Sequence, residues 1–173
     1  MYELKTLSSD ALSSALAKAK QYRFLGEPDE AESICLDILA VDPDHQDALI
    51  ILLLSLTDKF RHSDLGSCYA KALEIVEKLD DSYCKYYYLG IIYEKRAKYH
   101  LKKEGPGAVE ACYEWFVRAM AAFEKALADC DPNNQDAVLR WNSCARLLNS
   151  NPDIKANDTD SSDILLDPFE MPH

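Results

Sequence analysis

Nearly the same phrase occurs twice in the chain: "DPDHQDAL" at 42–49 and "DPNNQDAV" at 131–138, each time followed by a largely apolar run. A proline pushes the residue before it away from helical geometry, whereas Asp and Asn favour the position that caps a helix start. The phrase therefore predicts the end of one helix and the start of the next. Asp44 in the first copy and Asn133 in the second are the expected caps.

The composition agrees with a helical chain. Only five of the 173 residues are Gly, hydrophobic residues make up 48% and charged residues 28%. Ala, Leu, Glu and Lys are abundant, and these residues have high helix propensity. We expect an all-α fold.

Local signals mark the helix boundaries. Gly26 ends the first helical pattern, and Pro28 suits the first turn of the next helix. Pro43 ends that second helix, and "EGPG" at 104–107 separates two long ones. Together the signals predict seven helices, at 9–25, 28–41, 46–59, 63–79, 82–103, 108–129 and 135–148.

One 34-residue window, 12–45, has a recognisable pattern. It places Ala19 and Tyr22 in its first helix, Gly26 at the turn, "DEA" at the start of its second helix and "DP" at its end. This window resembles a tetratricopeptide repeat (TPR). The resemblance returns in "YYYLGIIY", where Leu89, Gly90 and Tyr93 match, and in "FEKALADCDPNN" at 123–134.

The spacing of the two phrases departs from a regular repeat. Two 34-residue units would separate them by 68 residues, but they lie 89 residues apart. The middle unit, 46–82, keeps the length and apolar pattern without the signature residues. The third repeat is therefore expected to have lengthened helices.

The resemblance implies a right-handed α-α superhelix of about three helical hairpins within a domain at 1–149. The hairpins would be 12–45, 46–82 and 83–134, with 135–148 as a closing helix. Stacked hairpins bury their apolar stripes in one continuous core. The expected packing residues are Tyr22, Leu89, Tyr93, Ala119, Phe123 and Ala126.

The resemblance also implies a binding surface, because the first helices of TPR hairpins line an inner face that binds peptides or partner helices. A tightly curled array would instead make these residues core, and this alternative is strongest for Ile50 and Ile51. The expected groove residues are Leu16, Lys20, Arg23, Phe24, Ile50, Ile51, Leu54, Tyr87, Tyr88, Ile91, Arg140 and Ser143.

One TPR function is not expected. TPR co-chaperones grip a chaperone's terminal carboxylate with lysine, asparagine and arginine on the inner positions, and such a clamp needs several donors. Only Lys20 is polar among the corresponding residues here, which are Leu16, Lys20, Ile51, Cys84 and Tyr88.

Residues 150–173 differ from the rest of the chain. The linker "NSNPDIKANDTDSSD" is polar and contains a proline, so disorder is expected from about residue 150. The final "DSSDILLDPFEMPH" combines acids with Ile164, Leu165, Leu166 and Phe169. An acidic, apolar motif after such a linker indicates a docking tail, in cis, in trans or on another protein; the alternative is an unstructured end.

Charge argues against nucleic acid. The formal net charge is −11, and an acidic protein repels a phosphate backbone. The basic run "KRAKYHLKK" at 95–103 is expected to be the solvated end of a long helix, where cations suit the helix dipole; the alternative is a binding role for an acidic peptide or RNA.

Catalytic and metal motifs are not found. The sequence has no nucleotide-binding glycine loop, zinc-protease motif or nucleophile elbow. The six cysteines include no C-x-x-C pair and are expected to be buried free thiols. We therefore expect a protein without enzymatic activity or cofactor.

The start of the chain lacks the features of a secretory signal. The apolar run at 48–56 has nine residues, too few to cross a bilayer. A cytoplasmic location without membrane contact is the expectation.

The leading functional prediction is an adaptor that binds a protein or peptide. Its nearest variant is a secretion-type chaperone, since small acidic three-repeat TPR proteins include the bacterial chaperones that hold translocator subunits. A second class is a structural subunit of a homo-oligomer or larger complex. The sequence leaves open whether the protein is a monomer or an oligomer.

Overall fold

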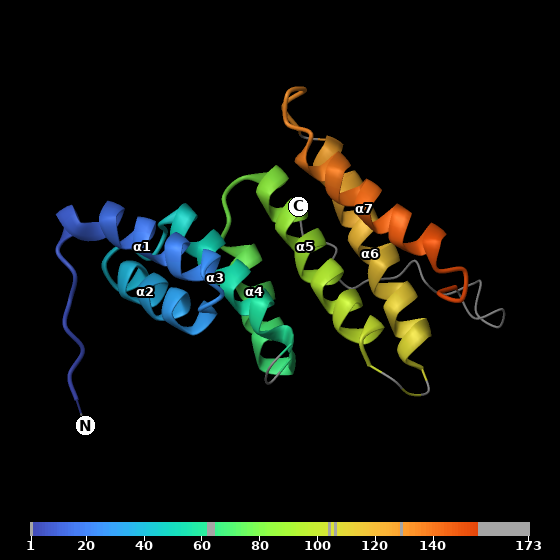
Figure 1. Cartoon of the computed structure of the whole chain (residues 1–173). Helices are drawn as coiled ribbons and strands as arrows, with labels where there is room; N and C mark the ends of the chain where they lie inside the picture. Colours follow the sequence, from blue (N-terminus) through green and yellow to red (C-terminus); the bar gives the residue numbers. More distant parts are fainter. Residues whose placement is uncertain (1, 62–64, 104, 106, 129, 156–173) are drawn as a thin grey trace.

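The computed structural model describes residues 2–61, 65–103, 105, 107–128 and 130–155 (Figure 1). These residues form helices and no strand, which confirms the all-α prediction. The elements are η1 (Ser9–Ala11), α1 (Leu12–Phe24), α2 (Pro28–Val41), α3 (Gln46–Asp58), η2 (Lys59–Arg61), α4 (Leu65–Glu77), α5 (Ser82–Leu101), α6 (Ala108–Ala128) and α7 (Asp136–Ser150).

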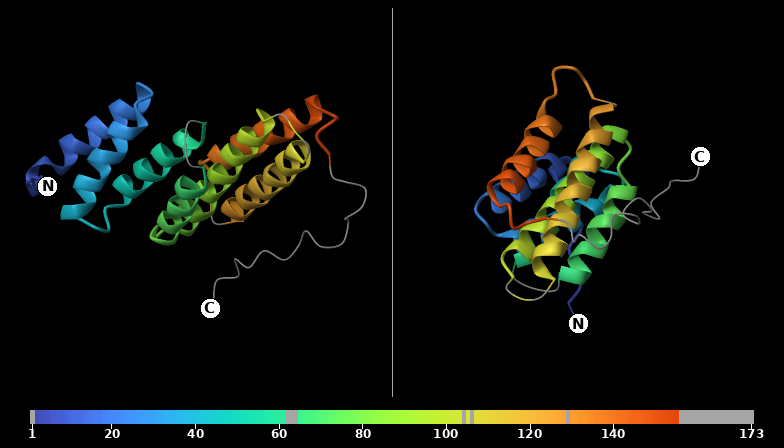
Figure 2. Two further views of the ribbon diagram at one scale, coloured as in Figure 1. Left: turned by 90° about the horizontal axis from the view of Figure 1, so that it is seen from below. Right: turned by 90° about the vertical axis from the view of Figure 1, so that its right-hand side faces the viewer.

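The helices form a row of antiparallel hairpins, α1/α2, α3/α4 and α5/α6, and α7 packs along α6 at the far end (Figure 1). Figure 2 shows the row from below and from its end. Each helix packs on the next one along the chain, and α1 also packs on α3 and α3 on α5. The odd-numbered helices α1, α3 and α5 therefore lie side by side in one layer.

Local chemistry sets the helix ends as expected. Gly26 follows α1 with a φ of +82°, a left-handed conformation that glycine adopts without strain. Pro28 is the first residue of α2, whose first turn also carries Asp29 and Glu30, and α2 ends at Val41 just before the first copy of the repeated phrase.

The capping residues differ from the prediction. His45, not Asp44, caps α3, and its Nδ1 accepts a hydrogen bond from the Ala48 backbone N–H at 3.4 Å. In the second copy the residue before α7 is Gln135, which forms no side-chain cap hydrogen bond, and the Asn134 side chain accepts from the Asp136 N–H at 3.1 Å. The cap position therefore lies one residue after the predicted Asp44 in the first copy and two residues after the predicted Asn133 in the second.

The repeated phrase also joins neighbouring hairpins. The Gln46 side chain donates to the Lys78 carbonyl at 3.3 Å and accepts from the Asp80 N–H at 3.0 Å. It thereby connects the start of α3 to the turn between α4 and α5.

The core confirms most of the expected packing residues. A Cβ built on Gly90 would lie 2.5 Å from Cε1 of Phe123, so glycine is what lets α5 approach α6. Tyr22 is the exception, because it is half-buried and the Lys18 ammonium lies 5.3 Å from its ring centroid. The expected residues that are buried are Leu89, Tyr93, Ala119, Phe123 and Ala126.

All six cysteines are free thiols, as expected, but two of them are only half-buried, Cys84 and Cys130. Burial, together with a nearby carboxylate, raises the pKa of the Cys35 and Cys144 thiols to about 12. These two buried thiols serve as small apolar residues rather than as nucleophiles.

Within the described ranges, no helix combines the length and the apolar character needed to cross a bilayer. The same residues contain no group of His, Cys, Asp and Glu that could hold a metal ion. The predicted docking residues Ile164, Leu165, Leu166 and Phe169 lie outside the described residues.

Candidate functional site

Ion pairs connect the odd-numbered helices in sequence. Lys20 of α1 lies 3.2 Å from Asp47 of α3. Asp58, at the other end of α3, contacts Arg23 of α1 at 2.9 Å and Lys95 of α5 at 2.7 Å. The Arg23 Nε–H forms no regular hydrogen bond, so this contact is an ion pair only. One carboxylate thus ties the first, second and third hairpins together.

A second carboxylate connects α5 to α7. Glu94 is 1% exposed, and its side chain pairs with Lys98 on the same helix and with Arg140 of α7, whose Nη1 lies 3.4 Å away. A buried carboxylate is costly unless it is paired, and these two cations offset that cost for Glu94.

We call this set the charge ladder. Helix periodicity explains why it forms, because residues separated by three, four or eleven positions share one helix face. Lys20 and Arg23 are three positions apart, and Asp47 and Asp58 are eleven apart. The ladder consists of Lys20, Arg23, Asp47, Asp58, Glu94, Lys95, Lys98 and Arg140.

The ladder has an excess of positive charge. Five of its side chains are cationic and three are anionic, so two positive charges remain after pairing. The whole chain, in contrast, has a formal net charge of −11. The odd-numbered helices therefore carry a locally positive strip on an acidic protein.

Apolar side chains lie on the same helices as the ladder. They are half-buried, pack against the core on one side and keep part of their surface in solvent. Tyr87 stacks on Tyr83 with ring centroids 5.5 Å apart and meets Tyr88 edge-on at 5.2 Å. These apolar side chains are Leu16, Ile50, Leu54, Tyr87 and Tyr88.

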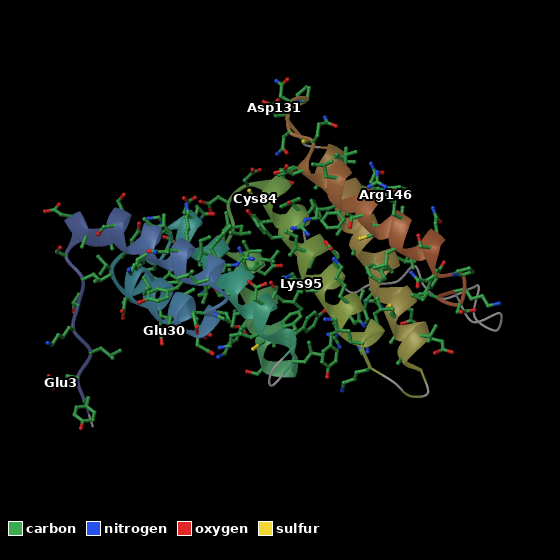
Figure 3. The ribbon with its side chains drawn as sticks, in the orientation of Figure 1. Glu3, Glu30, Cys84, Lys95, Asp131 and Arg146 are labelled. Carbon is green, nitrogen blue, oxygen red and sulfur yellow. The ribbon has the colours of Figure 1, made fainter. Side chains whose placement is uncertain are left out.

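We define the odd-helix face as the charge ladder together with these five apolar side chains. In Figure 3, Lys95 is labelled near the middle of the row of helices, and Arg146, outside the ladder, is labelled on α7.

Four of the predicted groove residues do not take part in this face. Ile51 is 8% and Ile91 3% exposed, so the expectation that they face solvent is wrong. Ile51 follows the half-exposed Ile50, and Ile91 lies three positions after the half-exposed Tyr88, but each faces the core because successive helical side chains are turned by about 100°. Phe24, 94% exposed, and Ser143, also exposed, belong to neither the charge ladder nor the half-buried apolar set.

The sequence analysis missed five residues of the ladder. The sequence predicts a solvated helix end for Lys95 and Lys98, but both are paired; among the basic residues of that run, Lys102 and Lys103 are exposed. The signal that could have found the acids is their spacing on the same faces as the predicted groove residues. The missed residues are Asp47, Asp58, Glu94, Lys95 and Lys98.

Arg96, from the same basic run, joins three helices. Its guanidinium lies 4.1 Å from the ring centroids of both Tyr69 of α4 and Trp115 of α6. Tyr93 adds a second aromatic contact to Trp115 at 5.4 Å. This cation–π cluster stabilises the junction of the second and third hairpins.

A small pocket lies between α4 and α5 on the opposite side of α5 from Tyr87 and Tyr88. Apolar side chains and charged ones both line it, including Val76, Leu89 and Lys85. It contains no converging set of nucleophile, base and acid, and we assign it no chemistry.

Comparison with known proteins adds no family to this description. A scan against protein-family models, a search of curated proteins and a search of solved structures each returned no match.

Proposed function

We propose that the protein is a TPR-like helical repeat protein, a right-handed superhelix that binds a peptide or helix on its odd-helix face without catalysing a reaction. Two features support the repeat assignment. The odd-numbered helices form one layer, as the first helices of stacked hairpins do. The small residues that carry the TPR resemblance, Ala19 and Gly90, are buried.

The observation that carries the binding proposal is the combination of charge and apolar surface on one face. Half-buried Leu, Ile and Tyr side chains offer contact area, and the ladder adds two unbalanced positive charges. A ligand with apolar side chains and carboxylates would cover these apolar side chains and neutralise the two positive charges. The proposed partner is therefore an acidic, apolar peptide or amphipathic helix.

This proposal differs from a terminal-carboxylate clamp. Lys20, the one cation among the positions that such a clamp uses, is already paired with Asp47. The positive excess lies instead at the pairs of Asp58 and Glu94, which involve Lys95 on α5 and Arg140 on α7. The proposed ligand would run along the face rather than insert its end.

A structural subunit is the second candidate. Apolar residues outside the odd-helix face are exposed, among them Leu36 of α2 at 52% and Leu139 of α7 at 64%. Exposed apolar patches can become subunit contacts. Light scattering over a wide range of protein concentrations checks this class, because a strict monomer contradicts it. Nothing in the described residues favours the secretion-type chaperone over a general adaptor.

The test uses variants that change the charge of the face without leaving a carboxylate unpaired. Lys95→Gln leaves Asp58 with Arg23, and Arg140→Gln leaves Glu94 with Lys98. Together the two substitutions remove the positive excess of the ladder.

The matched control removes the same charge elsewhere. Lys71 on α4 and Lys78 just after it are exposed and belong to no ladder pair, so Lys71→Gln/Lys78→Gln makes the same change of two charges. Circular dichroism checks that both double variants keep the helical fold.

The measurement is selection of a displayed library of short random peptides on the full chain, followed by sequencing. We expect enrichment of peptides that combine Asp or Glu with large apolar residues. Binding of these peptides should weaken roughly 10-fold in the Lys95/Arg140 variant, as expected for two lost charge contacts of about 0.7 kcal/mol each. Equal binding by both double variants, or no enrichment, contradicts the proposal.

A further inference from the structure

The chain contains a segment with the chemistry proposed for the ligand. Residues 163–170, "DILLDPFE", carry three acids and no base, with four large apolar residues between them. The segment lies outside the described residues. Its composition complements the odd-helix face, which has an excess of two positive charges beside half-buried apolar side chains.

The described part of the chain ends where this segment can reach the face. Ile154, just after α7, is 8% exposed and belongs to the core, so it holds the chain against the helices. In Figure 1, α5 and α7 run in the same direction. Arg140 precedes the end of α7 at Ser150 by ten residues, which is about 15 Å at 1.5 Å per residue.

The connecting stretch is long enough to cover this distance. Residues 156–162 lie between the described part and the acidic, apolar segment. Seven extended residues span up to about 24 Å, so the segment can return past the end of α7 as far as Arg140. Nothing in α7 has to unfold for it to do so.

We infer that residues 163–170 dock on the odd-helix face of the same molecule, and that an external partner has to displace them. The inference depends on the proposed function, since it assigns the face an internal competitor of the same chemistry. Tethering favours docking in cis, because a short connection along the chain provides an effective concentration of roughly 1 mM. Even a segment with a weak intrinsic affinity would then occupy the face for much of the time.

The test compares methyl and aromatic NMR spectra of the full chain with those of a tail variant, Leu165→Ser/Leu166→Ser/Phe169→Ser. Docking should shift the aromatic signals of Tyr87 and Tyr88, of which Tyr87 interacts with Arg140, and the methyl signals of Leu54, Ile50 and Leu16 farther along the face. The methyl groups of Leu36 on α2 and Leu127 on α6 are exposed outside the face, and they serve as controls that should not move.

A second experiment tests whether the face recognises the sequence of the tail itself. A synthetic peptide with the sequence of residues 161–173, added to the tail variant at roughly millimolar concentration, should move the signals of Leu16, Ile50 and Leu54 back toward those of the unmodified chain. Addition of salt should reverse part of this shift, because the ion pairs are partly exposed. In the unmodified chain the shifts should not depend on protein concentration.

Three results overturn the inference. Identical spectra of the unmodified chain and the tail variant mean that the tail does not dock. Shifts that grow with protein concentration indicate docking between molecules instead of in cis. Shifts confined to Leu36 or Leu127 place the contact on another surface.

The inference and the proposed function can fail separately. If the tail variant leaves the spectrum unchanged while library peptides still bind the face, only the inference fails. If the tail docks but the library yields no binder, the face is an internal contact site and the proposed external function fails.

Discussion

The two ends of the row are packed in different ways. Helices α1 to α4 have 13 or 14 residues each, and small residues such as Ala19, Ala31 and Cys35 are fully buried there. Helices α5 and α6 have 20 and 21 residues and bury the large rings of Phe116 and Phe123. Among the fully buried side chains of the first hairpin the largest is Ile38, whereas the third hairpin also buries two phenylalanine rings.

The charge ladder extends over both the short-helix hairpins and the long-helix hairpin. Asp58 pairs with Arg23 in the first hairpin and with Lys95 in the third. The buried side chains thus differ between the hairpins, while the odd-helix face continues over all of them. We therefore expect that substitutions in the core and substitutions on the odd-helix face have separate effects.

The largest effect should come from removing a ring of the long hairpin. Phe123 and Cys35 are both fully buried on the second helix of a hairpin. Phe123→Ala should lower the free energy of unfolding by about 3–5 kcal/mol, and Cys35→Ala by only about 1 kcal/mol. Chemical denaturation monitored by circular dichroism measures both; equal losses would remove the contrast between the two hairpins.

Gly90→Ala should come second. Alanine normally stabilises a helix by about 1 kcal/mol relative to glycine, but here the new Cβ would meet the Phe123 ring, and overpacking costs about 1–3 kcal/mol. We expect Gly90→Ala to lower the melting temperature in thermal denaturation. The smaller side chain in Gly90→Ala/Phe123→Leu should restore part of this loss of stability. A Gly90→Ala protein more stable than the parent would show that the helices separate without cost.

The third comparison is between two arginines. Arg96→Gln removes contacts to two rings and should cost about 1–2 kcal/mol, and Arg96→Lys should recover only part of it, because guanidinium stacks better than ammonium. Arg23→Gln removes a partly exposed ion pair at the other end of the row and should cost about 0.2–1 kcal/mol. A larger loss from Arg23→Gln in urea denaturation would place the main inter-hairpin stabilisation in the ladder instead.

The smallest effect concerns pH. Burial, with Arg96 and Lys103 nearby, lowers the pKa of His100 below its usual value of 6.5, and its Nε2 has no hydrogen-bond partner. Below about pH 6.5 the unfolded chain binds a proton that the folded chain does not, so the free energy of unfolding falls as pH falls. His100→Gln should show a smaller fall between about pH 7 and pH 5; an unchanged slope contradicts this assignment.

The sequence predicts the helices well because the residues that end or start a helix act on the backbone next to them. Gly26, Pro28 and Pro43 each act on the backbone beside them, so no knowledge of the fold is needed. The face is less predictable, because its pairs join residues far apart in the chain. Asp58 meets Lys95 across 37 positions, and no local pattern marks that contact.

Exposure is harder to predict than helix position. Ile50 and Ile51 are adjacent in one apolar run, yet only Ile51 is buried. The difference depends on how α3 is rotated between α1 and α5, which is set by packing of the whole row. The same packing buries Glu94, a residue that its type alone assigns to the surface.

The most direct test of the account is a map of where a ligand binds. An enriched library peptide is titrated into the full chain labelled at methyl and aromatic groups, and the perturbed signals are assigned. The account predicts perturbations at Leu16, Ile50 and Leu54 in the first two hairpins together with Tyr87 and Tyr88 in the third. Perturbations confined to α2, α4 or α6 would contradict the claim that the odd-helix face is the binding surface.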